Sequence, residues 1–356
     1  MKILINTPDY NKPSSGGVAS YYNGMLGYWN ENVKYNIVGR RHGISGVLWM
    51  PWDIVKFVVK ILEWQPDCIL LNPSIMINAL KRDFLFLRIA KCLGCNIAVL
   101  IHGFDLKVAG TIDQVWVRTY LNQASLVLTL AERFREIMRT WGVTTPIELI
   151  STKVEDRMLD GFDIASRDGQ IKNILFLSRM EKAKGVYETV DTFALLKEKY
   201  PYLRLSMVGS GSELDSLRKY VESRKIKDVT FVGALDGEAR LKAYRDADCF
   251  FFFSYGEGMP TVVLEAMAFG LPVMTRYVGG LCDFFEDGKM GGITDSFDPR
   301  DFAVMIEPFL NDENYTRKVS RYNHEYALKH FMASMVGRRI EQMLTQYTNY
   351  QEQIMQ

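Results

Sequence analysis

The feature of this sequence that most restricts its fold is a series of short, continuous apolar runs separated by longer segments with helical spacing. The runs are rich in Ile, Val, Leu and Phe and do not alternate between apolar and polar residues. They are Lys2–Asn6, Lys34–Val38, Cys68–Asn72, Asn96–Ile101, Leu126–Leu130, Asn173–Leu177, Arg204–Val208, Val229–Val232, Cys249–Phe253 and Pro272–Thr275. Continuous runs are typical of strands buried on both faces of a parallel sheet, and strands that alternate with helices form βαβ units. The sequence therefore predicts an α/β fold.

A polar stretch near the middle of the chain, Ile150–Lys172, interrupts this series. A new apolar run begins at Asn173, so the chain divides into two halves of similar size that each start with a strand. A length of 356 residues agrees with this division, because domains usually contain about 100–200 residues. We therefore expect two Rossmann-like domains, over residues 1–160 and 161–334, that face each other across a cleft at the carboxyl ends of their sheets, the usual ligand position in open α/β folds.

The composition excludes several classes of protein. Apolar residues make up 48% and charged residues 24% of the chain, which is ordinary for a globular protein and unlike a disordered or fibrous one. The 43 basic and 42 acidic residues leave a net charge of +1, whereas a protein that binds nucleic acid by neutralising phosphates carries a basic excess. We expect no nucleic-acid partner.

The pattern at the start of the chain and the cysteines favour a cytoplasmic protein. The first residues, Met1-Lys-Ile-Leu-Ile-Asn6, lead directly into a strand pattern without the layout of a signal peptide. The sequence has no uninterrupted apolar window of about 18 residues, so we expect no transmembrane helix. The five cysteines are an odd number, and several lie in apolar runs, which is typical of reduced thiols in the cytosol.

The most informative segment, residues 254–273, reads Ser-Tyr-Gly-Glu-Gly-Met-Pro-Thr-Val-Val-Leu-Glu-Ala-Met-Ala-Phe-Gly-Leu-Pro-Val. Gly258 permits a tight turn, and Pro260 suits the first turn of a helix over Thr261–Phe269. The free amides at the N-terminus of a helix bind anions readily. Glu257 in the loop and Glu265 in the helix carry carboxylates, which accept hydrogen bonds from pairs of hydroxyl groups such as those of a sugar or ribose.

Two cations follow the first strand of the second half. Arg179 leaves the end of the strand Asn173–Leu177, and Lys184 precedes Gly185 at the expected start of a helix. Arginine forks onto phosphate oxygens and lysine acts as a point charge, so this pair at the carboxyl edge of a parallel sheet suits a diphosphate. Taken alone, the same residues also fit a solvated loop with two ordinary surface cations.

In combination and in this order, the two clusters resemble those of retaining GT-B glycosyltransferases, specifically glycosyltransferase family 4 (glycosyl transferases group 1). Residues 257–266 match the family's paired-glutamate motif, and Arg179 with Lys184-Gly185 matches its diphosphate-binding pair. The turn at 208–213 is similar to the family's Gly-rich turn, and residues 231–233 resemble the strand and loop beside the nucleotide base. The resemblance implies the GT-B fold and a final helix, at about 335–356, that packs back on the N-terminal domain.

The resemblance also implies a role for each matching residue. Glu265 would bind ribose hydroxyls, and Glu257 would hold the donor sugar together with the backbone that opens the helix. Arg179 and Lys184 would neutralise the leaving diphosphate, and Leu235 would lie near the base. The implied donor-binding residues are Gly16, Gly17, Arg179, Lys184, Leu235, Gly258, Met259, Pro260, Thr261 and Glu265, and the implied catalytic residues are His102 and Glu257.

Two features of the N-terminal half agree with the resemblance. Gly16 and Gly17 follow the first strand, where the family has a Gly-Gly-Val turn and backbone amides can approach a phosphate. The turn is not G-x-G-x-x-G, so the dinucleotide fingerprint is absent, and an ordinary flexible loop is the alternative. His102 ends the strand Asn96–Ile101 and matches the family's histidine that touches the donor sugar near the reacting carbon. A purely structural histidine is the other interpretation.

The triplet Asp246-Ala-Asp248 has the D-x-D spelling of a metal site in another class of glycosyltransferase. It precedes the run Cys249–Phe253, where family 4 commonly has Ala-Asp as the lead-in to a strand. We therefore expect it to be structural, and we expect no bound metal or other cofactor. The two cations named above would then stabilise the charge of the leaving group.

Two apolar segments of the N-terminal half carry cations. Residues 46–62 contain Trp49, Trp52, Phe57, Lys56 and Lys60, and residues 79–91 contain Lys81, Arg82, Arg88 and Lys91. Both segments fit amphipathic helices that rest on an anionic membrane, as in relatives that use lipid-linked acceptors. They also fit core-facing helices of an α/β domain.

We therefore predict a retaining glycosyltransferase that moves a sugar from a nucleoside-diphosphate donor to an acceptor hydroxyl. The expected partners are the nucleotide-sugar donor and a glycan or lipid-linked acceptor in cell-surface polysaccharide or glycolipid synthesis. The expected location is the cytoplasm, with or without peripheral contact to the inner face of the membrane. A sugar-nucleotide epimerase of the same architecture and a non-catalytic nucleotide-sugar-binding subunit are the alternatives.

Overall fold

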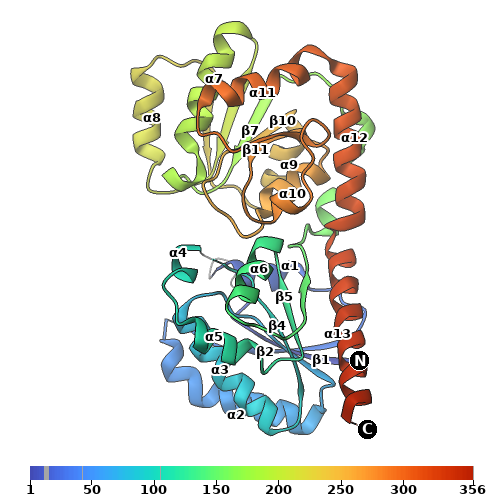
Figure 1. Cartoon of the computed structure of the whole chain (residues 1–356). Helices are drawn as coiled ribbons and strands as arrows, with labels where there is room; N and C mark the ends of the chain where they lie inside the picture. The colour runs from blue at the N-terminus through green and yellow to red at the C-terminus, as the bar shows by residue number, and fades with distance from the viewer. Residues whose placement is uncertain (12–15, 42, 105, 356) are drawn as a thin grey trace. The chain divides into compact units, whose positions relative to one another are not determined.

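The computed structural model of the chain describes residues 1–11, 16–41, 43–104 and 106–355. By its internal contacts the chain separates into two compact units. Unit 1 consists of Met1–Glu155 together with Ala333–Gln356, and unit 2 consists of Asp156–Met332 (Figure 1).

Within the described residues, unit 1 contains one parallel sheet of six strands in the order β2-β1-β3-β4-β5-β6. The strands are β1 (Lys2–Thr7), β2 (Asn32–Ile37), β3 (Cys68–Leu71), β4 (Asn96–Leu100), β5 (Leu126–Thr129) and β6 (Ile147–Leu149). The order reverses at β1, which has β2 on one side and β3 on the other. Ligands of open α/β sheets bind outside the carboxyl ends of the strands at such a reversal. The loops after β1, β3 and β4 therefore form the edge of unit 1 where a site is expected.

Helices cover both faces of this sheet. Those of unit 1 are α1 (Gly17–Gly24), α2 (Gly46–Trp64), α3 (Ile77–Cys92), α4 (Leu106–Ala109), α5 (Gln114–Leu121), α6 (Glu132–Thr140) and α13 (Ala333–Met355). One buried cluster joins the strand residues Leu4, Ile69 and Val99 to residues of α2, α3, α5 and α6, such as Phe57 and Phe86. Four of the strands are buried on both faces over most or all of their length, which explains why their sequences are continuously apolar.

The last helix, α13, completes unit 1. The buried carboxylate of Glu341 accepts hydrogen bonds from the backbone N–H groups of Asn30 and Glu31, both at 2.8 Å, and from the side-chain amide of Asn30 at 3.1 Å. Further along, the hydroxyl of Tyr347 donates to Glu148 Oε1 at 2.7 Å. The chain thus leaves unit 1 after β6 and returns to it for its final helix.

In the described part of unit 2, a second parallel sheet has six strands in the order β12-β11-β10-β7-β8-β9. They are β7 (Asn173–Leu177), β8 (Arg204–Val208), β9 (Val229–Gly233), β10 (Cys249–Phe252), β11 (Val273–Arg276) and β12 (Gly291–Thr294). Numbered from β7, this is the strand order of the Rossmann fold, and it reverses between β7 and β10. The loops after these two strands should therefore hold a ligand.

Helices again flank the sheet of unit 2. They are α7 (Val186–Lys199), α8 (Leu214–Ser223), α9 (Gly237–Asp246), α10 (Thr261–Ala268), α11 (Pro299–Asn311) and α12 (Glu313–His330). Helices α7, α8, α11 and α12 contribute to one buried cluster with β7, β8 and β10, in which the rings of Phe253 and Phe302 stack with centroids 3.8 Å apart. Helix α9 lies against β7 and contributes no residue to that cluster.

The α/β fold with two Rossmann-like sheets is confirmed, and every apolar run named above overlaps a strand. The sequence analysis missed β6 and β12. Strand β6 is only three residues long, and β12 begins with two glycines, so neither has the apolar run on which the prediction depended. Among the described residues, no helix is both long and apolar enough to cross a membrane.

Candidate functional site

The loops after β7 and β10 bring Lys184 and Glu257 together. The Lys184 ammonium donates to Glu257 Oε1 at 2.5 Å, with exposed side-chain fractions of 14% and 15%. The hydroxyl of Ser254, the second residue after β10, donates to the same Oε1 at 2.7 Å. Oε2 of Glu257 accepts no hydrogen bond from the described residues, and it is not among the atoms sealed from solvent. One carboxylate oxygen is thus fixed by the protein while the other is open to a ligand.

A glycine allows these two loops to come so close. Gly185 has φ +71°, a left-handed conformation that strains other residues, and an added Cβ would lie 2.3 Å from the carbonyl oxygen of Phe253. On the neighbouring residues, the backbone N–H of Tyr255 donates to the carbonyl of Ala183 at 2.8 Å. The approach of the two backbones positions Lys184 beside Glu257.

Glu265 lies on α10 and is held by α9. Its Oε2 accepts a hydrogen bond from the hydroxyl of Tyr244 at 2.7 Å and one from the Arg240 guanidinium. The negative charge of Glu265 raises the pKa of Arg240, and burial raises the pKa of the Tyr244 hydroxyl well above its usual value. Oε1 accepts no hydrogen bond within the described residues and is not sealed from solvent. Glu265 therefore has the same arrangement as Glu257, with one oxygen held and one open.

The segment between the two glutamates opens α10. The backbone carbonyl of Gly258 accepts a hydrogen bond from Gly280 N–H at 2.8 Å, Met259 follows, and the helix begins at Thr261 with Pro260 as its N-cap. The N-cap residue, Pro260, makes no side-chain hydrogen bond to the helix. The N-terminus of a helix carries partial positive charge, which favours an anion beside it.

Arg179 stands apart from this cluster in the structure. Its side chain is 68% exposed, and its Nη1 donates to Glu181 Oε1 at 2.7 Å. Within the described residues, no hydrogen bond or ion pair joins it to Lys184 or Glu257. An exposed ion pair is worth at most about 1 kcal/mol, so little opposes a move of the guanidinium onto a ligand.

The Gly-rich turn after β8 packs directly on the loop that carries Arg179. Gly209 has φ +143°, and a Cβ there would lie 1.8 Å from the carbonyl oxygen of Ser178. The backbone N–H of Met180 donates to the carbonyl of Ser210 at 2.9 Å. These contacts fix the path of the chain on either side of Arg179.

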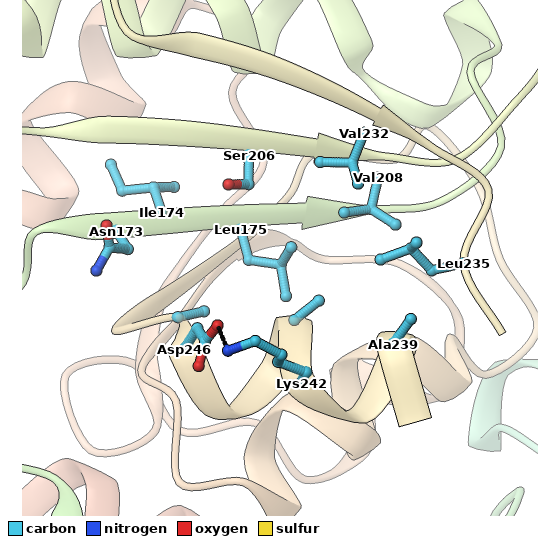
Figure 2. A pocket seen from close by; sticks show the side chains of 12 residues that line it. Asn173, Ile174, Leu175, Ser206, Val208, Val232, Leu235, Ala239, Lys242 and Asp246 are labelled. Atoms are coloured by element: carbon cyan, nitrogen blue, oxygen red, sulfur yellow. Dashed lines mark hydrogen bonds and ion pairs between the residues drawn. The ribbon is translucent and has the colours of Figure 1, made fainter. Parts of the chain in front are cut away.

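Leu235 lines a pocket of about 610 Å³ between the sheet and α9. Figure 2 shows strand residues such as Leu175 and Val208 on one side of the pocket and Ala239, Lys242 and Asp246 of α9 on the other. Leu235 and Val208 lie at the carboxyl end of the sheet, whereas Asn173, the first residue of β7, lies at the opposite end. Only the Leu235 end of the pocket is therefore close to the loops described above.

Both carboxylates of the Asp246-Ala-Asp248 triplet have partners in the protein. Asp248 Oδ2 accepts the backbone N–H groups of Lys172 and Asn173 at 3.0 and 2.8 Å, which ties the end of α9 to the start of β7. Asp246 pairs with Lys242 at 2.6 Å. In the part of the chain that the structure describes, no group of three or more His, Cys, Asp or Glu residues could hold a metal ion.

In unit 1, His102 lies just beyond the end of β4. Its Nε2 is 3.0 Å from Oδ1 of Asn72, the residue that follows β3, and the hydroxyl of Tyr22 donates to the same Oδ1 at 2.5 Å. The ring of Tyr21 stands edge-on to the imidazole with centroids 4.7 Å apart. Burial lowers the pKa of His102 to about 3, so the ring is neutral near pH 7.

Gly16 and Gly17 lie at the start of α1, with Gly16 as the N-cap. A Cβ at either position would meet no atom of the described residues within 4 Å. The two serines that precede Gly16 in the sequence lie outside the described residues. The structure thus assigns Gly16, Gly17 and His102 to unit 1 and the remaining predicted site residues to unit 2.

Helix α2 has both a buried face and an exposed apolar face. Phe57 and Ile61 are buried in the core. The opposite face exposes a stripe at helical spacing, formed by Leu48, Trp52, Val55, Val59 and Leu62. Helix α2 therefore faces the core with one side and exposes an apolar stripe on the other.

The neighbouring helix α3, which packs against α2, exposes Lys81, Arg88 and Lys91. Two of the expected surface cations instead face the interior. Lys60 Nζ donates to the carbonyl of Tyr35 at 2.6 Å, and Arg82 pairs with the buried Asp83 at 2.8 Å.

The sequence analysis did not identify the residues that hold the site in place. They are Ser254 beside Glu257, Arg240 and Tyr244 beside Glu265, and Asn72 and Tyr22 beside His102. Ser254 and Asn72 carry a usable signal, because each is a polar residue at the end of an apolar strand, where sites form. The others lie in helices and have no such signal.

The comparison with protein families decides what unit 2 resembles. Residues 162–326 match the family model of glycosyl transferases group 1. The matched range lies within unit 2 and includes Lys184, Glu257 and Glu265. Unit 2 is therefore similar to the glycosyl transferases group 1 family over this range.

Similar curated proteins include two bacterial enzymes. D-inositol 3-phosphate glycosyltransferase of Corynebacterium jeikeium is 26% identical over 226 residues, which is 58% of this chain and 54% of that protein. N-acetyl-alpha-D-glucosaminyl L-malate synthase of Bacillus anthracis is 25% identical over 264 residues, which is 71% of this chain and 66% of that protein. The chain thus aligns with roughly half to two thirds of the length of these relatives.

Solved structures share the fold over nearly the whole chain. HepE of Anabaena, in complex with UDP, matches 97% of this chain and 100% of its own chain with a TM-score of 0.75 at 17% identity. This likeness confirms the GT-B fold class, with its two Rossmann-like domains.

Proposed function

We propose that the protein is a retaining glycosyltransferase, similar to those of family 4, that transfers a sugar from a nucleoside-diphosphate donor to an acceptor hydroxyl. The arrangement of the two glutamates carries this proposal. Glu257 and Glu265 each have one carboxylate oxygen held by a cation and one open, within a domain that matches glycosyl transferases group 1. Open carboxylate oxygens accept hydrogen bonds from hydroxyl groups, so Glu265 binds the ribose and Glu257 the donor sugar.

Positive charge stabilises the leaving diphosphate in this mechanism. Lys184 already lies beside Glu257 in the site, and Arg179 is free to turn from its exposed partner Glu181 onto phosphate oxygens. The N-terminus of α10, with the partial positive charge of the helix dipole, adds a third source of positive potential. These groups act where the charge develops, and we propose that transfer needs no divalent metal or other cofactor.

His102 contributes to the donor sugar side of the reaction. A neutral imidazole carries a lone pair, which supports positive charge that develops at the anomeric carbon as the diphosphate leaves. The acceptor hydroxyl then attacks from the face that the diphosphate has left, so the anomeric configuration is retained. NMR of the anomeric proton of the product tests this stereochemistry, and an inverted product would contradict it.

Thermal unfolding with UDP, GDP, ADP or NAD tests the donor site. UDP is tested first because the structure of HepE, which has a similar fold, was solved in complex with UDP. One nucleoside diphosphate at about 100 Kd should stabilise the protein by about 2.7 kcal/mol. The shift should disappear in Glu265→Ala and shrink in Arg179→Ala, remain in the control Glu307→Ala, whose carboxylate pairs with exposed Lys199, and persist in EDTA. Stabilisation by NAD alone, or by none of the four, would reject the proposal.

We further propose that the acceptor is a glycan or lipid-linked molecule at the cytoplasmic face of a membrane, and that the protein binds this membrane peripherally. The exposed apolar stripe of α2 supports the proposal, since α2 packs against α3, which exposes the cations Lys81, Arg88 and Lys91. An apolar face flanked by positive charge suits the interface of an anionic bilayer.

Sedimentation with phosphatidylglycerol vesicles tests this membrane contact. We expect the wild type to bind these vesicles and not phosphatidylcholine vesicles. Val55→Glu in the α2 stripe should abolish binding, whereas Val304→Glu, at an exposed apolar position on α11 of unit 2, should leave it unchanged. Equal loss in both variants, or no binding by the wild type, would refute the membrane contact and leave the donor-site proposal intact.

A further inference from the structure

The residues around His102 determine which of its ring nitrogens carries the proton. Asn72 is buried, and its side-chain amide has two ends of opposite character, an oxygen that only accepts hydrogen bonds and a nitrogen that only donates them. The two ends are close to different groups. The protonation state of His102 follows from which end faces it.

Two backbone carbonyls fix the orientation of the Asn72 amide. Its Nδ2 lies 3.0 Å from the carbonyl oxygen of Asn6 and 3.1 Å from that of Leu70. Carbonyl oxygens cannot donate, so only the NH₂ end of the amide can occupy this place. A flipped amide would bring its oxygen against two carbonyl oxygens and leave buried acceptors without donors.

The opposite end, Oδ1, therefore faces Tyr22 and His102. It accepts the hydroxyl hydrogen of Tyr22 at 2.5 Å and lies 3.0 Å from His102 Nε2. Because Oδ1 has only lone pairs to offer, the hydrogen of this second contact must be on Nε2. A neutral imidazole carries a single N–H, so the remaining nitrogen, Nδ1, is bare.

We infer that Asn72 is a positioning residue that holds His102 in the Nε2–H tautomer and thereby presents Nδ1 as a hydrogen-bond acceptor. Nδ1 makes no hydrogen bond with the residues that the structure describes. Tyr22 supports the arrangement by occupying the other lone pair of Asn72 Oδ1. The ligand group that meets His102 must therefore donate a hydrogen bond.

This inference rests on the proposed function for the identity of that ligand. A hydroxyl of the donor sugar can donate to Nδ1, whereas an ionised phosphate or carboxylate oxygen cannot. His102 thus selects the hydroxyl-bearing part of the donor rather than its diphosphate. It acts as an acceptor and not as a cation or general acid.

The tautomer can be measured on the full-length wild-type protein without any substrate. Long-range ¹⁵N–¹H correlation spectra distinguish a protonated from a bare imidazole nitrogen, and His102→Gln identifies the signals of this residue among the four histidines. We expect a protonated Nε2 and a bare Nδ1 at neutral pH. A bare Nε2, or a charged ring, would overturn the inference, and this result does not depend on the folding of the Asn72 or Tyr22 variants.

Two variants separate positioning from a purely structural role. Asn72→Ala removes the acceptor, so the His102 signals should shift toward a mixture of tautomers. Tyr22→Phe leaves the contact between Asn72 and His102 in place and should keep the wild-type tautomer. An unchanged tautomer in a folded Asn72→Ala protein would refute the role of Asn72.

Kinetics distinguish failure of this inference from failure of the proposed function. Asn72→Ala should lower kcat for sugar transfer about tenfold, the rate equivalent of one neutral hydrogen bond, with no change in the Kd of the nucleoside diphosphate. If no nucleoside diphosphate binds the wild type, the proposed function fails while the tautomer result stands. If transfer proceeds with an unaltered kcat in Asn72→Ala, only the inference fails.

Discussion

Glu265 shows how a ligand-binding carboxylate is fixed at the level of single residues. Its Oε2 is bound by Tyr244 and Arg240, which lie four residues apart on α9, so one oxygen joins two helices. This arrangement keeps the open Oε1 in place before a ligand arrives. The contribution of these hydrogen bonds to stability can be measured by removing the hydroxyl group of Tyr244.

We expect Tyr244→Phe to lower the free energy of unfolding by about 1–3 kcal/mol. Tyr244 is fully buried, so the variant leaves the charged acceptor one bond short where water does not replace it. Urea unfolding followed by circular dichroism measures the loss. The matched change Tyr220→Phe removes a hydroxyl that donates to Asp191 at a half-buried site and should cost less. Equal losses in the two variants would show that the buried hydrogen bond to Glu265 contributes no more to stability than the half-buried one to Asp191.

A second residue-scale prediction concerns pH. Burial lowers the pKa of His102 from 6.5 to about 3, so between these values the unfolded chain binds a proton at this residue that the folded chain does not. The contribution of neutral His102 to the free energy of unfolding is therefore fully present above pH 6.5. It decreases as the pH falls toward 3, by about 1.4 kcal/mol per pH unit.

The variant His102→Gln removes this contribution. The difference in unfolding free energy between wild type and His102→Gln should therefore shift in favour of the variant as the pH is lowered below 6.5. Urea titrations at a series of pH values measure this difference. A difference that does not change with pH would mean that His102 titrates alike in the folded and unfolded chains.

At this scale the sequence predicted the groups that face a ligand better than the groups that hold them. Glu257, Glu265 and Lys184 stand in recognisable motifs. Arg240 is the partner of Glu265, and Asn72 that of His102, only because the fold brings α9 beside α10 and β3 beside β4. A hydrogen bond between distant parts of the chain leaves no spacing in the sequence that could reveal it.

Among the elements, the junction of the short helix Lys182–Lys184 with α7 is closely packed against the loop after β10. Gly185 and Gly161 both have φ +71°, but only Gly185 has a backbone oxygen where a Cβ would be placed. The two positions therefore form a matched pair. Alanine at either position would be strained by the left-handed conformation. Alanine at Gly185 would in addition collide with the carbonyl oxygen of Phe253.

Gly161→Ala should destabilise unit 2 by about 1–2 kcal/mol, from backbone strain alone. Gly185→Ala should cost about 1–3 kcal/mol more, because the β10 loop must move away from the new methyl group. Calorimetry on both variants measures the costs. Nucleoside-diphosphate binding should weaken only in Gly185→Ala, because the displacement separates Lys184 from Glu257. Equal melting temperatures and affinities in the two variants would contradict this account.

The elements that could be predicted are those with a long apolar run or a strong helix boundary. The segment Thr261–Phe269 was expected as a helix and occurs as Thr261–Ala268, since Pro260 and Gly270 mark its limits. Apolar composition could not show that α2 buries Phe57 while it exposes Trp52, because both residues are apolar. Which face is covered depends on neighbours that pack from elsewhere in the chain.

For the whole molecule, α13 is the element that joins the two ends of unit 1. Glu341→Ala removes the acceptor for the backbone N–H groups of Asn30 and Glu31, so we expect unit 1 to lose about 1–3 kcal/mol of stability. Hydrogen exchange followed by mass spectrometry should show faster exchange in the peptides of β2 and α13. Peptides of unit 2 should exchange at the wild-type rate.

Glu325→Ala, at an exposed position on α12 of unit 2, is the control for this experiment. It should leave exchange in unit 1 unchanged. If Glu341→Ala accelerated exchange equally in both units, the two units would unfold as one cooperative body, contrary to their separation by internal contacts.

The path of the chain between the units also sets the order in which the native structure is completed during synthesis. Unit 2 is one uninterrupted stretch, Asp156–Met332, whereas unit 1 is divided between Met1–Glu155 and the residues that follow unit 2. A ribosome therefore adds every residue of unit 2 before it makes α13, and Glu341 can reach Asn30 only after unit 2 has been made. Of the two units, translation of unit 1 begins first, and yet its native structure is completed last.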